Sequence, residues 1–88
     1  MLPPQSRESH LPRYFFHIHD GRSIRDTDGI ELAGVAEARH QAIATAGEMI
    51  RLDGHTVWNG GEWRMDVTDE TGSPVFTLRF AADDHAKA

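Results

Sequence analysis

The first apolar segment of the chain alternates with a period of two, which is typical of a β-strand half covered by other structure. Residues 14–19 are aromatic, β-branched or histidine, and such residues favour strands. Asp20-Gly21 follows directly and predicts a two-residue hairpin turn, with a short return strand over residues 22–25 that sets Ile24 opposite His17. One face of the first strand carries Tyr14, Phe16 and Ile18, and the other carries Phe15, His17 and His19.

A three- to four-residue apolar period then predicts an amphipathic helix of about five turns. Gly34 is its expected N-cap, and Asp53-Gly54 predicts a left-handed stop. The loop over residues 55–61 contains Trp58, which we expect to anchor it in the core. The apolar stripe of the helix consists of Val35, Ala38, Ala42, Ile43, Ala46, Met49 and Ile50.

Alternation returns in two segments that predict a second hairpin. Two registers are open. Pairing Val67 with Leu78 sets Asp66 opposite Arg79, whereas a two-residue slip sets Arg64 opposite Arg79. Like charges directly opposite each other are destabilising, so the first register is favoured. The apolar positions are Trp63, Met65 and Val67 in one strand and Phe76, Leu78 and Phe80 in the other.

These elements predict an α+β domain of β-β-α-β-β order over residues 12–82, with one amphipathic helix on one face of a three- or four-stranded, mainly antiparallel sheet. Residues 1–11 and 83–88 lack apolar periodicity and are expected to be a flexible arm and a flexible tail. The uncovered face of the sheet would carry Phe15, Ile24 and Val75 among polar residues. The expected core joins Tyr14, Phe16 and Ile18 to the helical stripe and to the apolar positions of the second hairpin.

Composition narrows the functional classes. Eighty-eight residues allow one core and one domain. A formal charge of −5 with scattered arginines disfavours nucleic-acid binding. The absence of cysteine excludes thiolate metal sites and fits a reducing cytosol. No stretch resembles a signal peptide or approaches the ~20 apolar residues of a membrane span, so a cytoplasmic protein is expected.

His17 and His19 are the strongest metal candidates, because residues two apart on a strand point the same way and Asp20 follows them. A zinc site needs further ligands, and the spacing selects none of those available. The favoured interpretation is therefore a solvated sheet face that holds no metal. The open choices for a further ligand are His40, His55, Asp26, Asp28 and Glu31.

No serine, threonine or phosphate-binding loop stands in a setting typical of catalysis, so neither a catalytic residue nor a cofactor is expected. The polar face of the sheet could instead meet another protein. The candidate interaction residues are Phe15, His17, His19, Arg64 and Arg79.

The segments PRYFFHIHDG (residues 12–21) and GGEWRMDVTDETGSPVFTLRF (residues 60–80) resemble a family of short bacterial proteins, domain-of-unknown-function family 6894. The resemblance covers most of residues 12–81. Such proteins usually begin with Met directly before Pro-Arg-Tyr-Phe-Phe-His, where this chain has Leu11. Gly34 stands where the family's helix more often opens with an acidic or hydroxyl cap. The resemblance implies no activity, ligand or catalytic residue.

We therefore expect a non-catalytic binding or assembly module whose partner is a second copy of the chain, giving a homodimer, or another protein. Two alternatives stay open: an antitoxin-like or regulatory partner-binding domain, and a metal-binding protein using His17 and His19.

Overall fold

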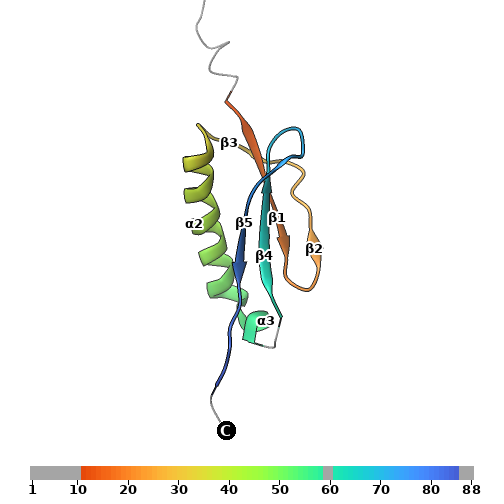
Figure 1. Cartoon of the computed structure of the whole chain (residues 1–88), viewed down its shortest axis with the longest axis vertical. Helices are drawn as coiled ribbons and strands as arrows, with labels where there is room; N and C mark the ends of the chain where they lie inside the picture. The colour runs from red at the N-terminus through yellow and green to blue at the C-terminus, as the bar shows by residue number, and fades with distance from the viewer. Residues whose placement is uncertain (1–10, 59–60, 86–88) are drawn as a thin grey trace, which may run out of the picture.

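A computed structural model describes residues 11–58 and 61–85 of the chain, and the expectations for residues 1–10 and 86–88 lie outside this range. One long helix covers one face of an antiparallel sheet, so the expected α+β class is confirmed (Figure 1). The elements in chain order are β1 (Arg13–His19), β2 (Ser23–Ile24), β3 (Ile30–Glu31), α2 (Val35–Asp53), α3 (His55–Trp58), β4 (Trp63–Thr68) and β5 (Pro74–Phe80).

The sheet has five strands, in which β2-β1-β4-β5 lie side by side and β3 also pairs with β1. Every pairing is antiparallel. The strands β2 and β3 occupy opposite ends of the same outer edge of β1, because β2 pairs near His19 and β3 pairs near Arg13. The β3 pairing was not anticipated from the sequence.

The first hairpin differs from the expected one by a single residue. His19 pairs with Ser23 and Ile18 with Ile24, so the loop has three residues and Ile24 does not lie opposite His17. The longer loop is stabilised locally, because the Asp20 amide donates to the Arg22 carbonyl at 3.0 Å and the Arg22 amide donates to the Asp20 carboxylate at 3.3 Å.

Asp26 covers the gap between β2 and β3 on the β1 edge. Its Oδ2 accepts the Phe16 amide at 3.1 Å, and its Oδ1 accepts the amides of Asp28 and Gly29 at 3.0 and 3.1 Å. Partial burial works to raise the pKa of Asp26. The amides of Gly29, Phe16 and Asp28, together with nearby His17, outweigh that effect and hold the pKa below 3.8. The side chain thus replaces a strand partner in the middle of this edge.

The expected register of the second hairpin is wrong. Met65 pairs with Leu78 and Arg64 lies opposite Arg79, the arrangement that charge repulsion seemed to exclude. Each arginine has its own carboxylate: Arg64 Nε lies 3.1 Å from Asp66 Oδ2, and Arg79 Nε lies 3.6 Å from Glu62 Oε2. Asp66, two residues along β4 from Arg64, and Glu62, diagonally across from Arg79, therefore relieve the repulsion.

A β-bulge at the start of β5 changes the direction of Val75. Thr68 pairs with Pro74 while Val67 pairs with Phe76, which leaves Val75 without a cross-strand partner. Val75 packs against the core, so the expectation that it lies on the uncovered face is wrong.

The helix α2 rests on the sheet through a narrow stripe of alanines. Ala38, Ala42 and Ala46 are fully buried, whereas Val35 is 39% exposed and Ile43 is 58% exposed. The expectation that Val35 and Ile43 belong to the core is therefore wrong. Alanine allows the helix to approach the sheet closely, and larger residues beside the stripe then project past the contact.

Helix α2 ends at Asp53 with Gly54 as its C-cap, as expected, but Gly54 is not in the expected left-handed conformation. Gly54 has φ −79° and ψ −1°, and the chain continues into α3. A Cβ at this position would collide with the Ile50 carbonyl oxygen, which explains the glycine. Val57 of α3 is buried, while Trp58 is 64% exposed, so the expected anchoring by Trp58 is wrong.

The rest of the expected core is confirmed. Trp63 packs edge-on against Phe80, with ring centroids 5.8 Å apart and an interplanar angle of 81°. Within the described ranges no helix combines the length and apolar character needed to cross a membrane. The buried members of the expected core are Tyr14, Phe16, Ile18, Ala42, Trp63, Met65 and Val67, and the partly buried members are Met49, Ile50, Phe76, Leu78 and Phe80.

Candidate functional site

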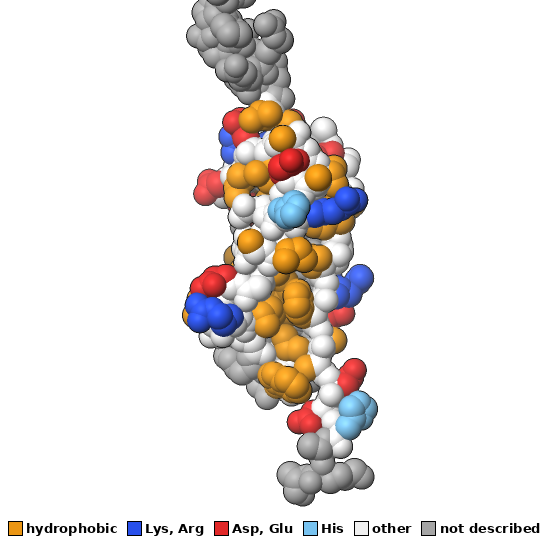
Figure 2. All heavy atoms as spheres, turned by 90° about the vertical axis from the view of Figure 1, so that its left-hand side faces the viewer, with side chains coloured by type: hydrophobic (Ala, Val, Ile, Leu, Met, Phe, Trp, Pro, Cys, Tyr) orange, Lys and Arg blue, Asp and Glu red, His pale blue; other side chains and the backbone are white. Residues whose placement is uncertain are grey.

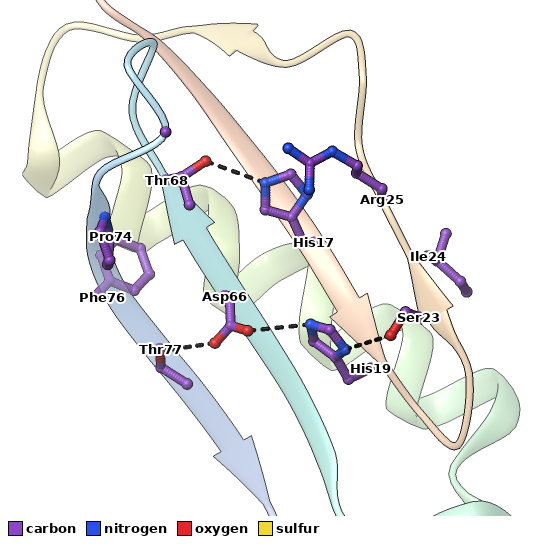
Figure 3. A pocket seen from close by; sticks show the side chains of 11 residues that line it. His17, His19, Ser23, Ile24, Arg25, Asp66, Thr68, Pro74, Phe76 and Thr77 are labelled. Atoms are coloured by element: carbon purple, nitrogen blue, oxygen red, sulfur yellow. Dashed lines mark hydrogen bonds and ion pairs between the residues drawn. The ribbon is translucent and has the colours of Figure 1, made fainter.

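A polar network occupies the centre of the open sheet face, the face that α2 does not cover (Figure 3). Asp66 on β4 is its hub: Oδ2 lies 3.1 Å from both His19 Nε2 and Arg64 Nε, and Oδ1 accepts the Thr77 hydroxyl at 2.9 Å. His19 Nδ1 lies 3.0 Å from Ser23 Oγ. The network therefore ties together β1, β2, β4 and β5.

The charge on Asp66 is favoured by its partners. Partial burial works to raise the pKa of Asp66, but the Thr77 hydroxyl, the Arg64 guanidinium and His19 outweigh it and hold the pKa below 3.8. A carboxylate accepts hydrogen bonds only, so His19 Nε2 carries the proton toward Asp66.

His17 is held in one tautomer by its two neighbours. The Asp26 backbone amide donates to His17 Nδ1 at 3.1 Å. An amide nitrogen cannot accept, so Nε2 carries the ring proton and donates to Thr68 Oγ1 at 3.1 Å. Phe15 stacks beside the His17 ring at 6.4 Å with an interplanar angle of 5°.

The nitrogen atoms through which His17 and His19 could bind a metal already interact with other groups of the protein. Both ring nitrogens of His17 and of His19 lie within hydrogen-bond distance of protein partners. Asp20 holds the hairpin loop and lies 3.9 Å from Arg22. Across residues 11–58 and 61–85, no group of three or more His, Cys, Asp and Glu side chains is arranged to hold a metal ion.

The further ligands considered from the sequence do not converge on this pair. Asp26 caps the β1 edge, and Glu31 lies 3.2 Å from Arg13 at the other end of the strand. Asp28 is exposed in the same loop, and His40 lies on α2, across the sheet. The side chain of His55 falls outside the described part of the structure.

The five candidate interaction residues share one face, as expected. Cross-strand partners lie on the same side of an antiparallel sheet, and Phe15, His17 and His19 pair with Thr68, Asp66 and Arg64. Arg79 joins them through its pairing with Arg64. Three of these side chains have acidic partners within the domain: His19 and Arg64 share Asp66, and Arg79 lies 3.6 Å from Glu62.

A shallow hollow of about 620 Å³ lies over this network. Besides His17 and His19 it is lined by Arg25 and Thr77, which sequence reasoning did not select. Thr77 could have been found from its alternation with Arg79 on β5. Arg25 directly follows β2, at the end of the return strand expected over residues 22–25, and nothing in that stretch of the sequence singles it out.

The sheet ends differently on its two sides, with the two-residue strands β2 and β3 outermost on one side and the seven-residue strand β5 outermost on the other. The β1 edge is covered by β2, β3 and the Asp26 carboxylate. The β5 edge faces no strand in the described residues, because β5 pairs only with β4. An uncovered edge presents unpaired amide and carbonyl groups to other chains.

Exposed apolar side chains lie beside the β5 edge. Ile43 of α2 projects next to Phe76 and Leu78 of β5, and a groove of about 270 Å³ runs between them, completed by Arg39 and Thr77. We call these five residues the β5 groove. Figure 2 shows hydrophobic side chains as a band down this side of the molecule. Sequence reasoning missed the groove because the helical period places Ile43 within the core stripe.

The architecture defines the chain as a small α+β domain with a polar open face and with a long strand, β5, whose outer edge faces no strand in the described residues. The chain belongs to the family described as a domain of unknown function, DUF6894, whose model matches residues 13–81. This confirms the resemblance found in the sequence. Neither the curated proteins nor the solved structures contain a match.

Proposed function

We propose that this domain is a non-catalytic binding module of the bacterial cytosol that recruits a protein partner along strand β5. An extended segment of the partner would add to the sheet at this edge, and its apolar side chains would cover the β5 groove. The observation that carries the proposal is the coincidence of an uncovered strand edge with the exposed Ile43 side chain.

Strand addition uses two sources of binding energy that this surface offers. Main-chain hydrogen bonds, each worth about 0.5–1.5 kcal/mol net, would form along β5. Ile43 is 58% exposed, so covering it would recover roughly half of the ~1.5–3 kcal/mol gained by fully burying such a side chain. The other side of the sheet offers a partner only the two-residue strands β2 and β3, which supports the view that the seven-residue β5 edge is the binding edge.

The open face of the sheet is a weaker candidate for a binding site than the β5 edge. Its carboxylate, imidazoles and guanidinium groups already satisfy one another, so a ligand would have to displace internal hydrogen bonds. The same point weighs against the metal alternative, because a metal ligand needs a ring nitrogen with a free lone pair.

Two matched variants test the proposal. Ile43→Lys places a charge in the β5 groove, and Leu52→Lys changes a residue that is 67% exposed and nine positions along α2, half a turn around the helix. The tagged full chain and both variants would be used to capture partners from the cells that produce the protein, and bound proteins would be quantified by mass spectrometry.

The proposal predicts a protein that is captured by the wild type and by Leu52→Lys and is reduced at least about tenfold with Ile43→Lys, a loss of about 1.4 kcal/mol or more. An Ile43→Lys profile that matches the wild type would refute binding at this edge.

A further inference from the structure

We infer that the segment pairing with β5 is the β5 strand of a second copy, giving a two-fold dimer centred on Thr77. This inference rests on the proposed function of the β5 edge and names its occupant. In such a dimer the two sheets become one continuous sheet, and both α2 helices lie on the same face of it.

The symmetry of the surface favours a second copy over an unrelated strand. Thr77 is the midpoint of β5, which runs from Pro74 to Phe80. Ile43 lines the same groove as Thr77, so it lies level with that midpoint. One two-fold axis at Thr77 therefore pairs residues 76–78 of β5 with the same residues of the second copy, on the regular side of the bulge, and also brings the two Ile43 side chains toward each other. It sets Phe76 of one copy opposite Leu78 of the other.

Charge is compatible with this alignment. The two Arg79 side chains would be about 14 Å apart, because four residues of strand separate them at ~3.4 Å per residue. The two helices run in opposite directions, so the positive end of one helix dipole lies toward the negative end of the other. Arg39 makes no ion pair within the described part of the chain. The reversal brings it toward the half of the second helix in which Glu48 is already paired with Arg51 at 2.7 Å, so charge neither favours nor opposes the contact there.

The mass of the particle is the first test. Sedimentation of the full chain from about 1 µM to about 500 µM should show the 9.8 kDa chain converting to a species of twice that mass as concentration rises. Leu52→Lys should behave as the wild type does, and Ile43→Lys should weaken association at least about tenfold. A 9.8 kDa species throughout overturns the inference.

Cysteine crosslinking tests the register, because the chain contains no cysteine of its own. Directly opposite residues have Cα atoms ~4.5–5.5 Å apart, which lies within the range that a disulfide spans. Thr77→Cys should therefore form a covalent dimer under mild oxidation. Arg79→Cys, two residues along the same strand and also exposed, should not, since its two copies are too far apart.

The outcomes separate this inference from the proposed function. Crosslinking of Arg79→Cys as fast as that of Thr77→Cys, or a dimer insensitive to Ile43→Lys, overturns the two-fold arrangement. A chain that stays monomeric but captures a different protein through Ile43 also overturns it, while leaving the proposed function intact.

Discussion

Replacing Asp26 with asparagine should destabilise the domain although the two side chains have the same shape. The carboxylate accepts the Phe16 amide on one oxygen and the amides of Asp28 and Gly29 on the other. Asparagine has only one acceptor atom at this end, so its NH₂ group must face one of these donors. Either the Phe16 amide on β1 or the Asp28 and Gly29 amides in the loop then lose their hydrogen-bond acceptor.

The expected cost follows from the hydrogen bonds that are lost. A hydrogen bond to a charged group contributes about 1.5–3 kcal/mol, so we expect a loss of about 2 kcal/mol. A domain of this size has a total free energy of unfolding of about 4–13 kcal/mol. Each kcal/mol shifts the melting temperature of such a domain by ~4–8 °C, so Asp26→Asn should melt about 8–16 °C below the wild type.

The effect should also depend on pH in a defined direction. The pKa of Asp26 is lowered by folding, so its contribution to stability is complete above its ordinary value of 3.8 and is lost as the pH falls through the folded value. The difference in melting temperature between wild type and Asp26→Asn should therefore stay constant from about pH 7 down to about pH 4 and narrow only as the pH falls further, through the folded pKa of Asp26.

Thermal unfolding followed by circular dichroism measures both effects, and Asp28→Asn is the control. Asp28 is exposed in the same loop and its carboxylate makes no hydrogen bond or ion pair with a described residue, so its replacement should change stability by less than ~0.5 kcal/mol. Equal melting of Asp26→Asn and wild type, or an equal loss with Asp28→Asn, would refute this account of the β1 edge.

Three further predictions concern stability. Gly29→Ala should lower the free energy of unfolding more than Gly21→Ala does. Both positions have positive φ, but a Cβ at Gly29 would lie 2.8 Å from the Phe15 ring, whereas a Cβ at Gly21 would meet open space. Equal urea midpoints for the two variants would contradict this. Met65→Ala should cost about 2–5 kcal/mol in urea unfolding because Met65 is fully buried, and a loss below ~1 kcal/mol would be inconsistent with that burial. Ile43→Lys and Leu52→Lys should each change the free energy of unfolding by less than ~0.5 kcal/mol, since both sites are exposed. A larger loss with Ile43→Lys would show that Ile43 belongs to the core after all.

The strands and the long helix could be predicted because their patterns are local. Alternation in β1, β4 and β5 depends only on which face is buried, and the structure buries the expected face in β1 and β4. The pairing of strands was less accessible. Opposing Arg64 and Arg79 is tolerated only because Asp66 and Glu62 lie on the diagonals, which a comparison of directly opposite residues does not consider.

The candidate surfaces were harder to predict because they depend on tertiary distances. The helical period counts Ile43 with Ala42, but only the close approach of the alanine stripe decides which of the two is covered. Asp26 stands in an Asp-Thr-Asp-Gly stretch that indicates a turn, and nothing local shows that its carboxylate reaches the edge of β1, ten residues away in sequence.

Photo-crosslinking in living cells tests the central claim most directly, whatever the identity of the partner. A benzophenone amino acid would replace Ile43 in the β5 groove, Leu52 on the opposite side of α2, or Ser23 on the open face, all of which are exposed. The account predicts a specific crosslinked product from position 43, containing either a second copy of the chain or another protein, and none of comparable yield from positions 52 and 23. Products from position 23 or 52 without one from position 43 would contradict it.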